Sequence, residues 1–211
     1  MNQCPLCYSE QTTNYISDRK RTFLYCEQCS LVFAEPKSWP NAALEKAEYD
    51  QHENHPDDDG YQRFLARMSR ALHRRLPSAA DVLDFGCGPS PVLAMQLQTL
   101  GHNVAVYDVF YYPERAVLVQ HYDAIVMTEV IEHLHAPGQV LTELFQQLKP
   151  GGVLAVMTQR VISQERFAKW NYKNDPTHVC FYSDATFHWI ANEKQAELSF
   201  EERDLVFLTR T

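Results

Sequence analysis

The sequence has no long hydrophobic run. Apolar residues make up 45% of its 211 positions, yet no stretch approaches the roughly 18 uninterrupted apolar residues that a membrane-spanning helix needs. The first residues, 1–5, contain neither the charged segment nor the apolar segment of a secretory signal. We therefore expect a protein without a membrane span that works in the cytoplasm.

Positive charge is also scarce. Lysine and arginine total 19 against 27 aspartates and glutamates, which gives a formal net charge of −8 at pH 7. A field of this sign repels phosphate backbones, so the composition disfavours nucleic acid as a partner and favours a small molecule. The short basic run Arg19-Lys20-Arg21 is an exception. We expect it to be a solvated loop, or alternatively a contact for RNA or for an acidic partner.

Cysteine, by contrast, is concentrated near the N-terminus. Four of the six cysteines form two pairs, Cys4 with Cys7 and Cys26 with Cys29, and this spacing is typical of a tetrahedral zinc site. A closed shell of four sulfurs leaves no position for substrate, so the zinc would be structural. Two disulfides or a redox pair are the alternatives, but nothing in the sequence suggests an oxidising compartment. We predict a zinc ribbon and linker over residues 1–40.

The remaining residues, 41–211, are predicted to form one α/β domain. Apolar periodicity predicts helices at 42–49 and 61–76, which would form a helical cap over 41–78. Beyond the cap we expect strands at 81–85, 103–107, 122–127, 153–157, 196–200 and 205–209, and helices starting at 91, 138 and 184. Alternating strands and helices favour a doubly wound, mostly parallel sheet. The last two strands have no helix between them, so an antiparallel hairpin should form one edge of that sheet.

A glycine turn, Gly86-Cys87-Gly88, follows the first strand of this domain. Asp84 before it would repel a pyrophosphate and attract a cationic ligand, and Pro89 and Pro91 remove N–H donors that a phosphate site needs. Asp108 stands 20 residues after Gly88, the offset at which an acidic residue takes ribose hydroxyls. S-adenosylmethionine, a nucleoside with a positive centre and no phosphate, fits these features. A nucleotide-dependent oxidoreductase is the alternative, which Asp84 and Pro89 oppose.

These motifs resemble those of the class I S-adenosylmethionine-dependent methyltransferases. Besides the glycine turn, the resemblance is carried by the run from Tyr122 to Leu134 and by Leu148-Lys149-Pro150-Gly151-Gly152. The cysteine pairs and the run from Trp170 to His178 are similar to a bacterial subgroup that joins a zinc ribbon to this domain. The resemblance implies a seven-stranded sheet with an antiparallel last strand. Only residues 109–121 separate the second strand from the third, so we expect a reduced sheet.

The resemblance also implies where the cofactor binds. Asp84, Gly86 and Gly88 would line its methionine end, Asp108 would hold the ribose, and Thr128 and Glu129 would lie beneath it. The expected cofactor-binding set is Asp84, Gly86, Cys87, Gly88, Asp108, Thr128 and Glu129. In the predicted cap, Tyr49, His52, Asn54 and Tyr61 are candidates to meet the cofactor or the acceptor, as lid residues often do.

The expected catalytic residues are His133, Glu132 and His178. Glu129, Glu132 and His133 share one face if a helical turn begins at the strand end, and His178 can reach the same cleft. Three interpretations stay open: a histidine general base oriented by Glu132, a divalent-metal site resembling that of small-RNA terminal 2′-O-methyltransferases, or hydrogen bonds that only hold loops together. The predicted function is methyl transfer to a small-molecule acceptor. A non-catalytic binding protein that docks RNA or protein through the ribbon is the alternative.

Overall fold

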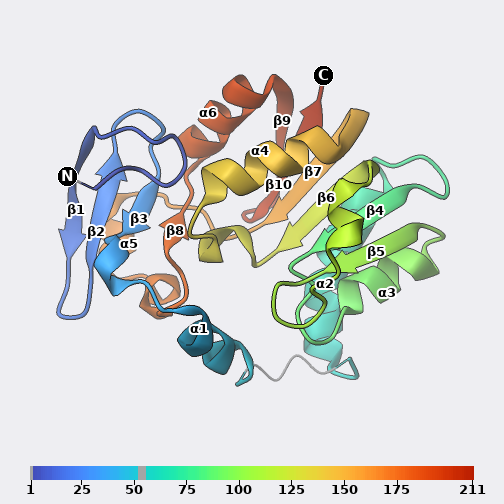
Figure 1. Cartoon of the computed structure of the whole chain (residues 1–211), viewed down its shortest axis with the longest axis horizontal. Helices are drawn as coiled ribbons and strands as arrows, with labels where there is room; N and C mark the ends of the chain where they lie inside the picture. The colour runs from blue at the N-terminus through green and yellow to red at the C-terminus, as the bar shows by residue number, and fades with distance from the viewer. Residues whose placement is uncertain (1, 52–55) are drawn as a thin grey trace.

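The computed structural model describes residues 2–51 and 56–211, whose strands form two sheets (Figure 1). The strands are β1 (Thr12–Ser17), β2 (Thr22–Cys26), β3 (Val32–Ala34), β4 (Asp81–Phe85), β5 (Asn103–Tyr107), β6 (Tyr122–Thr128), β7 (Leu148–Met157), β8 (Cys180–Phe181), β9 (Ala196–Glu201) and β10 (Leu205–Arg210). The α-helices are α1 (Ala42–Tyr49), α2 (Asp59–His73), α3 (Val92–Thr99), α4 (Pro137–Gln147), α5 (Gln164–Ala168) and α6 (Asp184–Lys194), and the 3₁₀ turns are η1 (Pro36–Ser38), η2 (Arg115–Val119), η3 (Ile131–His133) and η4 (Asn171–Asn174).

The larger sheet has the strand order β5-β4-β6-β7-β10-β9. Its first four strands are parallel, whereas β10 runs antiparallel to both β7 and β9. The predicted mostly parallel α/β sheet with a C-terminal antiparallel hairpin is therefore confirmed. Between β5 and β6 the chain forms only a bridge between Asp108 and Tyr112 and the turn η2, which accounts for six strands instead of seven in the described residues.

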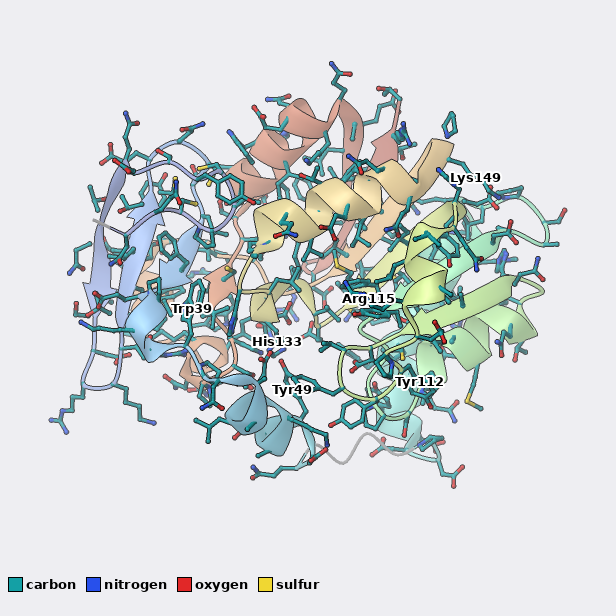
Figure 2. All side chains as sticks on the ribbon, in the orientation of Figure 1. Trp39, Tyr49, Tyr112, Arg115, His133 and Lys149 are labelled. Atoms are coloured by element: carbon teal, nitrogen blue, oxygen red, sulfur yellow. The ribbon has the colours of Figure 1, made fainter. Side chains whose placement is uncertain are left out.

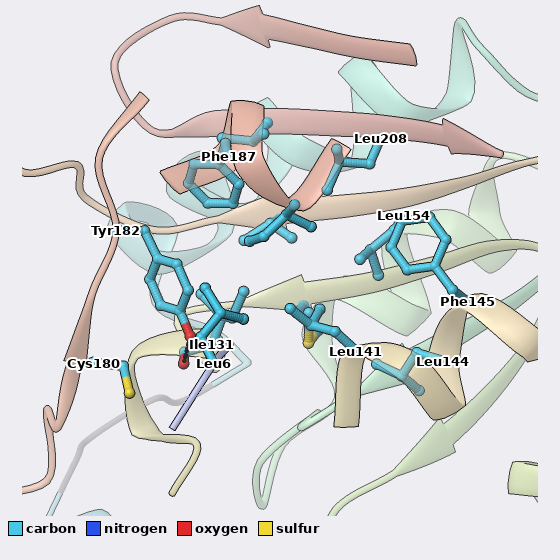
Figure 3. Close-up of a cluster of buried hydrophobic side chains, with 14 of the residues drawn as sticks. Leu6, Ile131, Leu141, Leu144, Phe145, Leu154, Cys180, Tyr182, Phe187 and Leu208 are labelled. Atoms are coloured by element: carbon cyan, nitrogen blue, oxygen red, sulfur yellow. Dashed lines mark hydrogen bonds between the residues drawn. The ribbon is translucent and has the colours of Figure 1, made fainter. Parts of the chain in front are cut away.

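Helices cover both faces of this sheet, so its central strands are apolar on both sides. On one face Ile125 and Met127 of β6 pack with α4 and α6, and Figure 3 shows this cluster around Leu141, Leu154 and Phe187. On the other face the intervening residues of β6 pack with α2 and α3. Alternation along each strand thus builds two cores and leaves the carboxyl ends of the parallel strands open for a ligand.

The smaller sheet has the order β1-β2-β3-β8 and lies beside α4 and α6 (Figure 1). The cysteine pairs flank its strands, with Cys4 and Cys7 before β1, Cys26 at the end of β2 and Cys29 before β3. Its fourth strand comes from far along the chain, because Phe33 pairs with Cys180. Leu31 and Phe33 belong to the same buried cluster as α4. A side chain at Gly138 of α4 would lie 2.2 Å from the carbonyl oxygen of Leu6. The first cysteine turn therefore packs directly on the α/β domain, and the division of the chain near residue 40 remains a prediction.

Helix starts follow their capping residues. Asp58 accepts a hydrogen bond from the Tyr61 N–H and begins α2 two residues before the predicted start. Ser183 caps α6, as predicted, in a reciprocal pair with Thr186. Our expectation for α3 was wrong in detail, because Pro91 occupies the N-cap position and no side chain caps the helix. Across the described residues, every helix is too short or too polar to cross a bilayer.

A candidate active site at the carboxyl ends of the parallel strands

A cavity of about 750 Å³ opens beyond the ends of β4, β5 and β6. Eight of the ten predicted cofactor and catalytic residues line it: Gly86, Cys87, Gly88, Asp108, Thr128, Glu129, His133 and His178. The other two, Asp84 and Glu132, are buried behind its wall. Residues that are up to 92 positions apart in the sequence thus meet at one place, because each follows a parallel strand or joins the loop before β8.

The glycine turn forms one wall of the cavity. Gly86 has a φ of 81°, and a side chain there would collide with Val130 at 2.5 Å. The Asp108 carboxylate accepts hydrogen bonds from the N–H groups of Gly88 (3.0 Å), Phe110 (2.8 Å) and Tyr111 (3.1 Å). These bonds tie the two strand ends together and hold the carboxylate beside the turn.

Asp84 lies beneath the turn rather than on the cavity surface. Burial raises the pKa of its carboxyl to about 7, although a hydrogen bond from the Ala94 backbone opposes the rise. At neutral pH this carboxyl is therefore close to the midpoint of its titration, and a cation bound above it would favour the charged form. Its predicted contact with the cofactor stays a prediction.

Two glutamates meet at the far side of the cavity through Tyr172. The Tyr172 hydroxyl donates to Glu132 and lies 3.3 Å from an oxygen of Glu129, and Thr158 donates to the second Glu132 oxygen at 3.0 Å. Burial, reinforced by the neighbouring Glu132 charge, raises the pKa of Glu129 to about 9. Burial also raises the pKa of Glu132. At neutral pH the pair therefore retains a proton.

The two predicted catalytic histidines touch each other. Their ring centroids are 4.6 Å apart. His133 Nδ1 donates to the Thr177 carbonyl at 3.2 Å, and His178 Nδ1 donates to the Tyr172 carbonyl at 2.7 Å. Because a carbonyl can only accept, each imidazole donates through Nδ1, and a neutral ring bonded in this way is basic at Nε2. That arrangement suits a proton acceptor and equally suits a metal ligand.

A metal remains compatible with this cluster. Ligand atoms of Glu132, His133 and His178 all lie within 4.8 Å of one another. Glu132, however, already accepts hydrogen bonds from two hydroxyls, and these would compete with a cation for its oxygens. All three interpretations stay open, since both histidines line the cavity and both also bond carbonyls of the loop before β8.

Helix α1 covers the cavity. Its Tyr49 ring contacts His133 at 5.2 Å and Phe110 at 5.9 Å between centroids, and Figure 2 shows Tyr49 close to His133. Tyr61 of α2 lines the same cavity. The other two cap candidates, His52 and Asn54, lie outside the described residues.

Sequence reasoning missed Tyr172, Asp175 and Thr158 as members of this site. Asp175 lines the cavity and has an oxygen 3.8 Å from His178 Nε2. Hydrogen bonds from Thr177 and the charge of His178 lower the pKa of Asp175 despite its burial. The clustering of aromatic and polar residues at 170–178 was the available signal. Tyr172 and Asp175 stand in that run. The run was recognised as part of the family resemblance, but only His178 in it was given a role.

The four N-terminal cysteines also come together. Cys4 and Cys29 have their sulfurs 3.5 Å apart, Cys7 and Cys26 have theirs 3.4 Å apart, and all four lie within 4.8 Å of one another. Tetrahedral zinc with bonds of about 2.3 Å places its sulfurs about 3.8 Å apart. All six cysteines are free thiols. Within the cluster a hydrogen bond with Cys29 lowers the pKa of Cys4, whereas burial raises the pKa of Cys7 and the bond with Cys4 raises that of Cys29. The donor set fits zinc.

A family model described as a methyltransferase domain matches residues 49–198. The chain belongs to this methyltransferase family. Among curated proteins, the methyltransferase is similar to the ubiquinone biosynthesis O-methyltransferase of Rickettsia akari, with 24% identity over 175 residues that cover 68% of this chain and 69% of that protein. The corresponding protein of Rickettsia canadensis is 28% identical over 161 residues, 62% of this chain and 67% of that protein.

Solved structures show the same fold. The Burkholderia thailandensis 1,6-didemethyltoxoflavin-N1-methyltransferase, crystallised with S-adenosylhomocysteine, aligns with a TM-score of 0.61 at 16% identity, over 93% of this methyltransferase and 98% of that chain. An O-methyltransferase family protein from the same organism aligns with a TM-score of 0.53 at 13% identity, over 82% and 64% of the two chains. The methyltransferase is thus an S-adenosylmethionine-dependent enzyme, and the oxidoreductase and non-catalytic alternatives are set aside.

Proposed function

We propose that the methyltransferase moves a methyl group from S-adenosylmethionine to a hydroxyl group of a small molecule. The observation that carries this proposal is the pair of cavity-lining imidazoles, each of which has its Nδ1–H committed to a main-chain carbonyl. A hydroxyl is a weak nucleophile, so methyl transfer to it benefits from a base of this kind. The similarity to curated O-methyltransferases supports the same acceptor atom.

The residues around the glycine turn fit the cofactor. Gly88 has a φ of 65°, and the space beside it is open, so a ligand can approach the main chain closely there. The Asp108 carboxylate is placed to accept ribose hydroxyls, and the Phe110 ring on the same wall offers an apolar face to adenine. When bound, S-adenosylmethionine supplies an electrophilic methyl group on a sulfonium sulfur. Asp84 beneath the turn stabilises positive charge there.

The catalytic proposal assigns one step to each polar group. His133 Nε2 takes the proton of the acceptor hydroxyl as the methyl group transfers, and the Thr177 carbonyl fixes the tautomer that makes this possible. The Glu132 carboxyl is buried behind the two rings, where its negative charge would interact favourably with a protonated imidazole. Glu129, protonated at neutral pH, can donate a hydrogen bond to the acceptor.

Aromatic and aliphatic side chains make up much of the cavity wall. Tyr49, Tyr61, Phe64 and Leu65 line it from the cap. An apolar wall with a few polar groups at one end suits a small organic acceptor, and a planar ring stacks well on such side chains. The proposed acceptor is therefore a hydroxylated small molecule with an apolar body.

We also propose that Cys4, Cys7, Cys26 and Cys29 hold one structural zinc ion. The convergence of the four sulfurs supports this, and a bound ion would add folding energy to the short strands of the ribbon, beside their packing against the α/β domain. The four sulfurs close the coordination shell, so the ion would brace the ribbon and take no part in methyl transfer.

The proposal is tested by methyl-labelled S-adenosylmethionine offered with matched phenols, anilines and carboxylic acids. We expect label on the phenols. His133→Asn should lower the rate by about 10²–10⁴-fold and leave calorimetric S-adenosylhomocysteine affinity within about threefold. His188→Asn, on the exposed surface of α6, is the matched control and should match the wild type.

Label found only on anilines or acids, or full activity of His133→Asn, would refute the hydroxyl assignment. Elemental analysis separates the base from the metal interpretation. A second divalent equivalent beside zinc, lost in His133→Asn, would favour the metal site.

A further inference from the structure

Arg21 stands in the turn between β1 and β2, far from the glycine motif in sequence, yet its guanidinium reaches the loop that carries His178. It donates to the main-chain carbonyls of His178 (2.9 Å), Asp175 (2.8 Å) and Pro176 (3.4 Å), and also to that of Lys173. The sequence grouped Arg21 with Arg19 and Lys20 as a surface basic patch. The structure corrects that grouping, because Arg21 is half-buried and bonded whereas its two neighbours are exposed.

A second contact joins the β1–β2 turn to the same loop, and here the cation comes from the loop and the anion from the turn. Lys173, in the loop, reaches back to the β1–β2 turn and bonds Asp18 at 2.6 Å, with its side chain only 5% exposed. The Phe23 ring lies beneath both cations, 5.1 Å from the Arg21 guanidinium and 5.5 Å from the Lys173 ammonium. Both ends of the contact are therefore fixed, and the loop cannot shift without breaking a buried charged interaction.

The loop held in this way carries the polar side of the candidate site. The carbonyl of Tyr172 orients His178, and that of Thr177 orients His133. Val179, which directly follows His178, donates its N–H to the Glu132 carbonyl. The Tyr172 hydroxyl also bonds Glu132. Each group that fixes an imidazole therefore lies within two residues of a carbonyl bonded to Arg21.

Here several carbonyl oxygens converge on one group that carries both positive charge and several N–H donors. Without the guanidinium, their dipoles would repel one another and the buried acceptors would lose their donors. Arginine suits this position because its planar group has five N–H donors in a fixed fork, whereas lysine offers a compact charge without that geometry.

We propose that Arg21 is a positioning residue for methyl transfer, which folds residues 172–178 around His133 and His178 and makes the ribbon a working part of the active site. The proposal rests on the function proposed above for the role of the imidazoles. The placement of the loop is independent of that function and can be measured without an acceptor.

The experiment compares wild type with Arg21→Lys and Arg21→Met, and with Lys20→Met as the matched control from the exposed neighbour. Amide hydrogen exchange is followed at His178 and Val179, whose N–H groups bond Asp175 and Glu132. Nitrogen-15 shifts of the His178 ring report its tautomer. The affinity for S-adenosylhomocysteine is measured by calorimetry. Methyl transfer to the phenol probes is measured with methyl-labelled S-adenosylmethionine.

In Arg21→Met we expect exchange at both amides to rise by about tenfold or more, and the His178 nitrogen shifts to move toward averaged tautomers. Methyl transfer to the phenol should fall at least about tenfold, mainly in kcat, while S-adenosylhomocysteine affinity stays within about threefold. Arg21→Lys should recover only part of each effect, which guards against a variant that simply folds poorly. Lys20→Met should behave as wild type.

Unchanged exchange and unchanged His178 shifts in both Arg21 variants would overturn the proposal. Failure of the proposed function shows differently: the wild type itself would transfer no label to phenols or would not bind S-adenosylhomocysteine, while the exchange and ring-nitrogen effects of Arg21→Met would persist.

Discussion

Glu129 adopts an unusual backbone conformation at the end of β6. Its φ is 54°, in the left-handed region that glycine prefers, and its N–H bonds the Met157 carbonyl of the neighbouring strand. Non-glycine residues in this region store strain and concentrate at functional sites. The conformation turns the carboxyl toward Tyr172 and the cavity rather than along the strand.

The ionisation of Glu129 makes a testable contribution to stability. Its folded pKa of about 9 lies above the ordinary value of 4.5, so its stabilising contribution is complete below that ordinary value and is lost as pH rises through about 9. Glu129→Gln, which mimics the protonated acid, should remove this loss. We expect the free energy of unfolding of wild type to fall by about 1–3 kcal/mol relative to the variant between pH 5 and 9.

Denaturant titrations of both proteins at a series of pH values measure the effect of Glu129→Gln. Parallel stability profiles would contradict a protonated Glu129. A larger loss in the variant at high pH would point to a carboxylate that is needed in its charged form.

At the scale of single residues, the sequence located groups that belong to a local motif. The glycine turn, Asp108 and the pair Glu132-His133 follow strands whose apolar pattern is readable, and the cavity contains or adjoins all of them. Arg21 belongs to no motif, and the run that contains Tyr172 did not indicate which residues Tyr172 contacts. Their partners lie about 150 and 40 positions away, and nothing local marks such a contact.

Helix α1 is a cover held by few contacts. None of its residues is fully buried, and its end is tied to the loop after β5 by the Tyr111 hydroxyl, which donates to Asp50 at 2.7 Å. Lys46 bonds the same carboxylate at 2.8 Å and lies 4.9 Å from the Tyr111 ring. An element with little buried surface opens at low cost, so this latch should govern how long a ligand stays in the cavity.

Tyr111→Phe removes the hydroxyl and keeps the ring. One hydrogen bond contributes about 0.5–1.5 kcal/mol, so we expect S-adenosylhomocysteine to dissociate about 2–10-fold faster, with little change in its association rate. Stopped-flow fluorescence measures both rates. Tyr112→Phe is the neighbouring control and should match the wild type; equal dissociation rates in all three proteins would show that α1 is not held by this latch.

At the scale of elements, the length of a strand decided whether the sequence could predict it. The strands of the large sheet are five residues or longer, and the sequence identified five of the six within one residue at each end. The exception is β7, which begins at Leu148, five residues before the predicted start at 153, because the expected turn at 149–152 continues the strand. Strand β8 has two residues and pairs with β3 across 147 to 149 positions. Such a strand exists only because a partner is there, so no periodicity could reveal it.

The whole molecule is built as two sheets that share one side of the core. Cysteine side chains of the ribbon, Leu6 and the α4 residues Leu141 and Leu144 occupy the same buried cluster, which Figure 3 shows near Cys180. Strand β3 of the ribbon pairs with β8. Beside this pair, the Ala34 N–H donates to the carbonyl of Val179, the residue after His178. The order of the ribbon should therefore propagate to the polar side of the active site, but not to the glycine turn on the far side of the cavity.

Removal of the proposed zinc tests that coupling. Elemental analysis should find about one zinc per chain, and Cys4→Ser should lose it. Because metal binding supplies much of the folding energy of such a ribbon, amide protection should fall in β1 to β3 and at Val179, while β4 and β6 keep theirs. Cys87→Ser, outside the cluster, should retain the metal. A metal-free Cys4→Ser protein with full protection at Val179 would show that the ribbon folds without the ion and that the site does not depend on it.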